Sequence, residues 1–124
     1  MKEHSIQVQV VTEYLSHQSK PHKKEYAFAY HITVSNRGDE DAHLLSRHWI
    51  ITDGNGLRRE VKGMGVVGEQ PSICPGENYK YSSGAVLETE VGTMQGSYHM
   101  QDSNGVGFDV EIPIFSLALP NALN

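Results

Sequence analysis

The stretch LLSRHWIITDGNGLRREVKGMGVVGEQPSICPG, residues 44–76, contains the features that decide the fold. Its first part, Leu44 to Asp53, is rich in apolar and β-branched side chains and predicts a strand. Alternate residues of a strand share a face. One predicted face therefore carries Leu45, Arg47, Trp49 and Ile51, and the other carries Leu44, Ser46, His48 and Ile50. Apolar groups on both faces indicate a strand inside a sheet, covered on most sides.

Asp53-Gly54-Asn55-Gly56 follows this strand and predicts a tight hairpin turn. Such turns need positive φ angles, which glycine adopts without a clash of a Cβ atom. Leu57 to Lys62 is then the expected return strand. Its charged residues are Arg58, Arg59, Glu60 and Lys62. This much charge is typical of a strand at the edge of a sheet, where it discourages pairing with foreign chains.

The next residues, Gly63 to Gly68, match the pattern G-x-G-x-x-G. In a dinucleotide-binding fold this pattern follows a buried strand and opens a helix whose amino end faces the pyrophosphate. Here a charged strand precedes it, and Pro71 and Pro75 follow too closely for a useful helix. We therefore expect the glycines to permit positive φ or close packing. The alternative is an anion site built from Gly63, Gly65 and Gly68, with Arg58, Arg59 or Lys62 as its cations.

The rest of the chain also predicts strands, at Ser5–Tyr14, Glu25–Asn36, Asn78–Ser83, Met94–Gln101 and Val106–Leu117. The clearest core face belongs to the second of these segments and consists of Tyr26, Phe28, Tyr30, Ile32 and Val34. Gly84 to Glu90 is expected to cross between sheets, and Pro113 is expected at an edge or a bulge. Seven to nine strands without a convincing helix predict an all-β, antiparallel β-sandwich. Because no linker interrupts the pattern, we expect a single domain over residues 1–124.

Composition excludes several classes of function. The 124 residues carry a formal net charge of -5, which argues against general binding to nucleic acid, since that needs Lys and Arg against phosphates. The first ten residues lack the apolar stretch of a signal peptide, and no apolar run approaches the length that spans a bilayer. Cys74 is the only cysteine, so no internal disulfide forms. We expect a cytoplasmic protein that binds neither nucleic acid nor membrane.

No set of residues predicts a catalytic or metal site. The chain has seven histidines, but His43 and His48 are five apart, which in a regular strand puts them on opposite faces. Metal sites need several ligands converging on one point. Cys74 has no activating neighbour in sequence, and a lone thiol is usually inert. We therefore expect no enzyme, no cofactor and no resident metal.

Arg47 and Trp49 admit two interpretations. If their predicted face is core, the guanidinium of Arg47 must meet a carboxylate or backbone carbonyls, because an unpaired buried charge is very costly. If the face is partly open, the two side chains could anchor a partner, since Arg and Trp are typical of interaction hot spots. We favour the structural role, because a lone Trp in a sandwich is usually core.

Several stretches resemble the bacterial ApaG (CorD) family. They are YAFAYHITVSNRG (26–38), LLSRHWIITDGNG (44–56), EVKGMGVVGEQPSICPGENYKYSSG (60–84), GTMQGSYHM (92–100) and GVGFDVEIPIFSL (105–117). The resemblance implies an immunoglobulin-like, fibronectin type III-like sandwich. It also implies an association with cobalt resistance and magnesium efflux. Similar domains in eukaryotic F-box and polymerase-associated proteins look like protein-interaction modules.

These observations lead to one main hypothesis and two alternatives. The main hypothesis is a non-catalytic module that docks an unidentified protein partner, since sandwiches commonly bind through a sheet face, an edge strand or end loops. The first alternative is an anion binder, for a nucleotide or pyrophosphate, at residues 63–68. The second is a binder of a divalent metal, Mg²⁺ or Co²⁺. Self-association into a homo-oligomer is left open.

Overall fold

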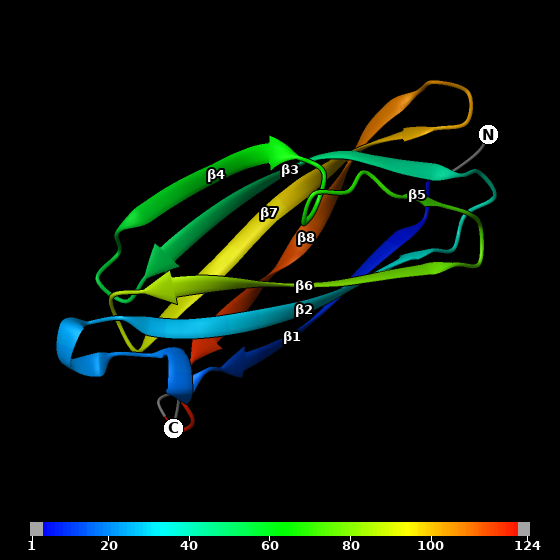
Figure 1. Ribbon diagram of the computed structural model, residues 1–124. Coiled ribbons are helices and arrows are strands. Elements are labelled where there is room, and N and C mark those ends of the chain that lie inside the picture. Colours follow the sequence, from blue (N-terminus) through cyan, green and yellow to red (C-terminus); the bar gives the residue numbers. More distant parts are fainter. Residues whose placement is uncertain (1–3, 122–124) are drawn as a thin grey trace.

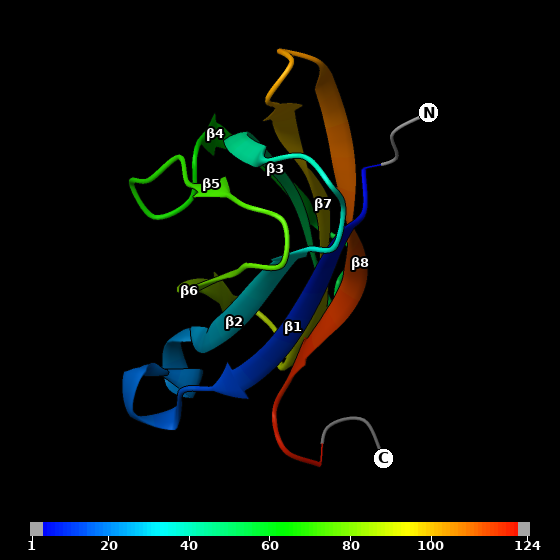
Figure 2. The ribbon, with the colours of Figure 1, turned by 90° about the vertical axis from the view of Figure 1, so that its right-hand side faces the viewer.

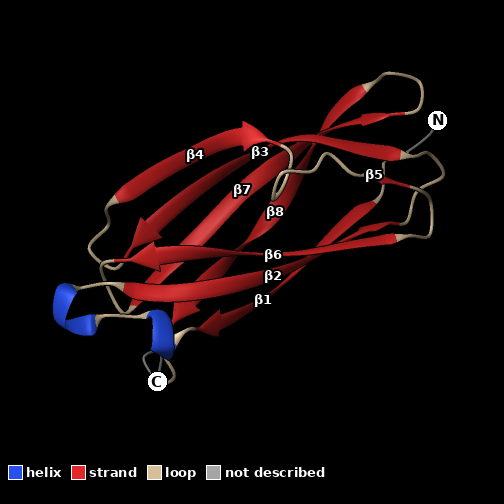
Figure 3. Ribbon diagram, in the orientation of Figure 1, coloured by secondary structure: helices blue, strands red, loops and turns tan. Residues whose placement is uncertain are grey.

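The computed structural model of the chain describes residues 4–121 (Figure 1). Within this range the chain forms eight strands, two short 3-10 helices and no α-helix (Figure 3). In chain order the elements are β1 (Ile6–Tyr14), η1 (Ser16–Gln18), η2 (Pro21–Lys23), β2 (Tyr26–Asn36), β3 (Ala42–Asp53), β4 (Arg58–Met64), β5 (Ser72–Ile73), β6 (Asn78–Leu87), β7 (Val91–Asp102) and β8 (Gly107–Ala118). The all-β prediction is confirmed. No helix among the described residues is long and apolar enough to cross a membrane.

The strands form two antiparallel sheets that face each other (Figure 2). One sheet has the order β1-β2-β6. The other has the order β4-β3-β7-β8, and the short strand β5 also pairs with β3. The predicted antiparallel sandwich is therefore confirmed, and β4 is an edge strand as its charge indicated. The more specific immunoglobulin-like or fibronectin type III-like classification stays a prediction from the resemblance.

The core lies between the sheets and contains the residues that strand alternation predicted. On β2, Phe28, Tyr30, Ile32 and Val34 are buried, and Tyr26 is partly buried. They pack against Trp49 and Ile51 of β3 and against inward-facing residues of β7 and β8. Polar groups at the margin are satisfied locally, since the Asn36 side chain donates to the carbonyls of Glu40 and Ile73. The core is thus one apolar layer closed by hydrogen-bonded turns.

The two long sides of the sandwich differ, and we name them by their strands. On the closed side β1 lies beside β8 (Figure 2). On the open side the edge strands β4 and β6 do not pair with each other. There the guanidinium of Arg59 donates to the Val86 carbonyl at 3.0 Å, and the Tyr79 hydroxyl donates to the Glu69 carboxylate at 2.7 Å. Side chains, not a shared ladder, connect the sheets on the open side.

A β-bulge in β3 corrects one prediction. The register with β7 shifts between Leu44 and Ser46, so Leu45 is an extra residue without its own partner. The bulge restarts the alternation, and consequently Leu44 is buried on the same inward face as Trp49. The prediction that His43 and His48 lie on opposite faces was wrong, because both now point outward. The predicted grouping of Leu45 with Arg47 and Trp49 fails for the same reason.

The structure shifts the expected crossing between the sheets and confirms the expected position of Pro113. The expected crossing at Gly84 to Glu90 begins later, because β6 continues to Leu87 and pairs with β2 along its whole length. Gly84 allows this close pairing, since a Cβ there would lie 3.2 Å from the Phe28 carbonyl oxygen. The expectation for Pro113 is confirmed. It lies in the edge strand β8 opposite the register shift between Met94 and Gly96 of β7.

Candidate functional site

The glycine-rich segment forms a second tight turn beyond β4, and no helix begins in it. Val66 is fully buried, and its amide donates to the Glu69 carbonyl at 2.7 Å while the Glu69 amide donates back at 3.0 Å. The two residues between them, Val67 and Gly68, have φ angles of 48° and 80°. Positive φ at both central residues defines the primed turn that suits a two-residue hairpin. Val67 is unusual there, because it is β-branched and 62% exposed.

Of the three predicted glycines, Gly65 is required by close packing against backbone, whereas Gly63 lies against the end of the flexible Arg47 side chain. Gly65 has φ +63°, and a Cβ there would lie 2.2 Å from the Glu69 carbonyl oxygen. A Cβ on Gly63 would lie 2.8 Å from Nη1 of Arg47. Gly68 has open space around it and is needed for its φ of +80° alone. The pattern G-x-G-x-x-G in this chain therefore serves backbone bending and contact, the role that the flanking sequence indicated.

Arg47 and Trp49 both have structural roles. Nη1 of Arg47 donates to the carbonyls of Met64, at 3.1 Å, and Gly65, at 2.8 Å. This arrangement gives the part-buried guanidinium two carbonyl partners and fixes the start of the glycine-rich segment. Trp49 is 2% exposed and packs edge-on against the rings of Tyr30, Tyr98 and Phe115. That the two side chains anchor a partner stays a prediction; the burial of Trp49 does not favour it, whereas Arg47 is only partly buried.

The six residues of the predicted anion site do not converge. The amides of Gly65, Val66 and Glu69 already donate to backbone carbonyls, so they are not available to an anion. Arg59 points to β6 and donates to Val86. Arg58 and Lys62 pair with Thr52 and His48 of β3, which places them on the outer face of the sheet. The anion hypothesis stays a prediction that this geometry does not favour.

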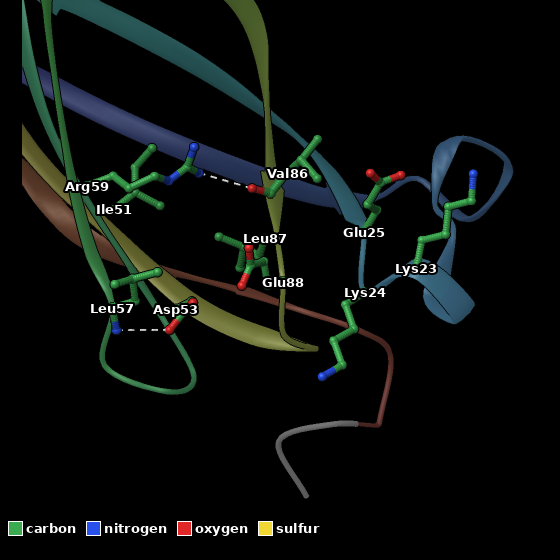
Figure 4. Close-up of a pocket in the computed structure, with 10 residues that line it drawn as sticks. All are labelled: Lys23, Lys24, Glu25, Ile51, Asp53, Leu57, Arg59, Val86, Leu87 and Glu88. Atoms are coloured by element: carbon green, nitrogen blue, oxygen red, sulfur yellow. Dashed lines mark hydrogen bonds between the residues drawn. The ribbon is translucent and has the colours of Figure 1, made fainter.

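A hollow of about 440 Å³ lies at one end of the open side (Figure 4). It is bounded by the β3–β4 hairpin, the end of β6 and the turn after η2. Ten residues line it: Lys23, Lys24, Glu25, Ile51, Asp53, Leu57, Arg59, Val86, Leu87 and Glu88. Its apolar part combines the buried Ile51 and Leu87 with Leu57, which is 59% exposed. Val86 contributes its carbonyl to the lining, and its side chain points away from the hollow on the outer face of β6 (Figure 4). An exposed leucine beside a buried apolar floor marks a place where an apolar group of another molecule could be buried.

The rim of the hollow carries charges of both signs. Two of them have structural bonds, since Arg59 donates to the Val86 carbonyl and the Asp53 carboxylate accepts the Asn55 and Leu57 amides. Figure 4 shows Lys24 extending toward the hollow and Lys23 pointing away from it. Lys24 ends η2 with φ 55°, which turns the chain back toward β2. The mixed rim favours a ligand that itself carries both charges, such as a peptide segment, over a simple anion.

Sequence reasoning did not find this hollow. Its lining comes from four separate segments, and only the folded arrangement brings them together. Two signals were present, namely the basic loop at residues 15–24 and an exposed Leu57 directly after a turn. The sequence alone does not show that these two segments lie near each other, because their proximity depends on the order of the strands in the sheets.

The outer face of the larger sheet carries two histidine–carboxylate pairs. Nε2 of His48 lies 2.7 Å from the Glu60 carboxylate, and Nδ1 of His99 lies 2.8 Å from the Asp109 carboxylate. The hydrogen bond from His48, aided by its charge, lowers the pKa of Glu60 below the usual glutamate value. Each carboxylate thus holds one ring in place. Within residues 4–121 no group of three or more His, Cys, Asp or Glu side chains is arranged to hold a metal ion.

Cys74 is exposed, and its surroundings disfavour the thiolate. A hydrogen bond with Glu77 and the charges of Asp41 and Glu77 raise the pKa of the Cys74 thiol above its ordinary value. Nucleophilic cysteines need the opposite, an electropositive environment that lowers the pKa. The geometry therefore offers no activated nucleophile at this position.

The fold and its surface define a small antiparallel β-sandwich protein with a hollow at one open end. Residues 16–102 match the family model described as the ApaG domain. The chain belongs to the ApaG family. Protein ApaG of Pseudomonas paraeruginosa is 57% identical over 98% of this chain and 97% of its own length, and Protein ApaG of Aromatoleum aromaticum is 53% identical over 99% and 97%.

Solved structures agree with the fold. The crystal structure of an ApaA protein from Bordetella pertussis has a TM-score of 0.94 and 45% identity, covering 98% of both chains. A second X-ray structure has a TM-score of 0.91 and 49% identity, covering 95% of this chain and 89% of its own.

Proposed function

We propose that this ApaG family chain is a non-catalytic module that docks another protein through the hollow on its open side. The observation that supports the proposal is the exposure of Leu57 above a floor formed by the buried Ile51 and Leu87. An exposed apolar side chain next to a buried apolar floor in a concave site is typical of a binding site.

The hollow suits a short segment of a partner protein. An apolar side chain can replace water over Ile51 and Leu87, and the flanking backbone can follow the rim. The charges of Lys24 and Glu88 then select acidic and basic groups on either side of that anchor. A single apolar anchor surrounded by charge gives modest affinity and high selectivity.

The non-catalytic part of the proposal is supported by the chemistry of the described residues. The acidic neighbours of Cys74 raise the pKa of its thiol, and the outer-face carboxylates of Glu60 and Asp109 pair with histidines on a water-exposed sheet. The rim cation Arg59 is committed to a backbone carbonyl. In this proposal the family association with cobalt resistance and magnesium efflux operates through the docked partner.

The test compares variants that alter the hollow with a matched variant elsewhere. Leu57→Asp places a charge over the apolar floor, and Lys24→Glu reverses the rim charge that extends toward the hollow (Figure 4). Both changes leave the core untouched, since both residues are exposed. Val106→Asp makes the same change as Leu57→Asp at a residue 52% exposed in the β7–β8 hairpin, which lies at the opposite end of β3 from Asp53. Each purified protein is used to capture partners from lysate, with quantitative mass spectrometry.

The proposal expects at least one protein that the wild type and Val106→Asp retain and that both hollow variants lose. Direct titration of that protein should show the same ranking. If the captured proteins are the same for all four baits, the hollow is not the docking site and the proposal fails.

A further inference from the structure

The hydrogen bonds at the two ends of β4 determine which of its backbone groups face β3 and which face outward from the free edge. β4 ends its sheet and pairs with β3 alone among the described strands. The Asp53 amide donates to the Leu57 carbonyl, and the Gly65 amide donates to the Leu45 carbonyl. Because backbone groups of an antiparallel strand alternate in direction, the odd-numbered residues between these points face β3. Arg58, Glu60 and Lys62 therefore direct their amides and carbonyls outward from the edge.

The side chains of these three residues alternate in charge. They stand on the outer face of the sheet, opposite Thr52, Ile50 and His48 of β3. If two copies of β4 pair antiparallel about Val61, Glu60 of each copy lies opposite Lys62 of the other. This pair exchanges two backbone hydrogen bonds, because both residues point outward. Opposite charges facing each other across strands stabilise the pairing.

Other registers of the same pairing are unfavourable. A shift that centres the pairing on Glu60 puts Glu60 opposite Glu60, and one that centres it on Lys62 puts Lys62 opposite Lys62. A shift that centres it on Arg59 puts two inward-facing guanidinium groups opposite each other. Like charges directly opposite are destabilising. The register about Arg59 also sets Arg58 opposite Glu60, but it has two like charges at its centre. Only the register about Val61 combines opposite charges with an apolar residue at the centre.

The inner face of the pairing is also compatible. Val61, which is part-exposed at the edge, meets Val61 of the second copy. Arg59 lies opposite Gly63, which has no side chain to obstruct it, and Arg47 over Gly63 already donates to two carbonyls. A charged edge strand normally rejects foreign strands. Here the order of charges along β4 disfavours pairing with most foreign strands, but it is complementary to a second, antiparallel copy of β4.

We propose that two copies of this chain associate through antiparallel pairing of their β4 edges about Val61, which joins the two larger sheets into one continuous sheet. The interface has two-fold symmetry, as isologous contacts require. One added strand pair buries less surface than a standard stable interface, so the dimer is weak and depends on concentration. This inference concerns a surface other than the hollow and goes beyond the proposed function.

The test exploits the self-complementary charge order. Glu60→Lys gives Lys opposite Lys twice, and Lys62→Glu gives Glu opposite Glu twice. Each single variant should dimerise roughly tenfold or more weakly than the wild type, because two attractive pairs become repulsive. An equimolar mixture of the two variants pairs a positive edge with a negative one and should recover a dimer. The double variant Glu60→Lys/Lys62→Glu should recover it also.

Sedimentation equilibrium over a dilution series measures these associations. Lys80→Glu, an exposed charge reversal on the other edge strand, β6, is the matched control and should dimerise like the wild type. Amide hydrogen exchange gives a second measurement, in which the amides of Glu60 and Lys62 should become protected as concentration rises.

Three outcomes overturn the proposal. They are a wild type that stays monomeric throughout the series, single variants that dimerise like the wild type, and a mixture that stays monomeric. The hollow variants Leu57→Asp and Lys24→Glu should leave the dimer intact. A loss of docking with an intact dimer, or the reverse, therefore separates the failure of this inference from the failure of the proposed function.

Discussion

The closed and open sides of the sandwich connect the two sheets in different ways. On the closed side the sheets meet directly, and the His4 ring before β1 stacks on Phe108 of β8 at 3.7 Å between centroids. On the open side two edge strands remain unpaired with each other, and Arg59 and Tyr79 reach across. One side therefore closes the core by direct contact of strands, and the other leaves the edges of β4 and β6 without a strand partner between them.

The glycine-rich segment contributes to this difference between the two sides. It leaves β4, buries Val66, and turns back at Val67 and Gly68 toward β5 (Figure 1). Its Glu69 then receives the Tyr79 hydroxyl from the opposite sheet. The segment thus covers the core at one end of the open side, where a strand pair is absent.

The largest effect is expected in the core that both sides share. Trp49→Ala should lower the free energy of unfolding by about 3–5 kcal/mol, because it removes a buried ring with three aromatic neighbours. That is a large part of the roughly 5–15 kcal/mol typical of a whole domain. Urea denaturation measures it, with the exposed Val106→Ala as the control. An unchanged midpoint would show that the ring is not core.

The next effect tests whether the open side depends on its glycines. Gly65→Ala should cost about 2–4 kcal/mol, since it adds overpacking against the Glu69 carbonyl to a left-handed φ. Gly68→Ala should cost only about 1 kcal/mol, because its surroundings are open and the φ penalty acts alone. Equal losses in thermal denaturation would contradict the packing role of Gly65.

A smaller effect concerns the bond between the sheets on the open side. Tyr79→Phe removes the hydroxyl that donates to Glu69 and should cost up to about 1 kcal/mol, since the bond is exposed to water. The bond to Glu69 also raises the pKa of the Tyr79 hydroxyl. Hydrogen exchange should show faster opening at the Val66 amide and no change along β1. Uniform acceleration would mean that the two sides are not independent.

The smallest effect tests the closed side by pH. The Asp102 carboxylate accepts from Nε2 of His4 and from the amides of Val106 and Asn104, and these bonds lower its pKa. A lowered pKa in the folded state gives stability that is complete above the ordinary aspartate value and is lost as pH falls through the lower value. Asp102→Asn should therefore flatten the acid part of the stability profile. A profile parallel to wild type would exclude this contribution.

Much of the fold could be predicted because its signals are local. Alternation along residues 26–34 identified the core face of β2, and the glycines after Asp53 and Asp102 identified two hairpins. The carbonyl partners expected for Arg47 are also present, although its guanidinium is only partly buried. In each case a short stretch of residues contains the whole physical reason.

Other features depend on contacts between distant segments. The bulge at Leu45 arises from the pairing of β3 with β7, and it reversed the predicted placement of His43 relative to His48. The hollow needs η2, β4 and β6 in their final places before its lining exists. The position of β1 beside β8 is likewise set by sheet order, which no single stretch specifies.

The left-handed valine at the tip of the second turn has a consequence for engineering. A β-branched residue at φ 48° stores about 1–3 kcal/mol of backbone strain, and its side chain gains no burial in return. Asparagine or glycine relaxes that backbone without touching the interior. A single substitution at Val67 should therefore raise the thermal stability of the chain, because it removes backbone strain at one exposed turn.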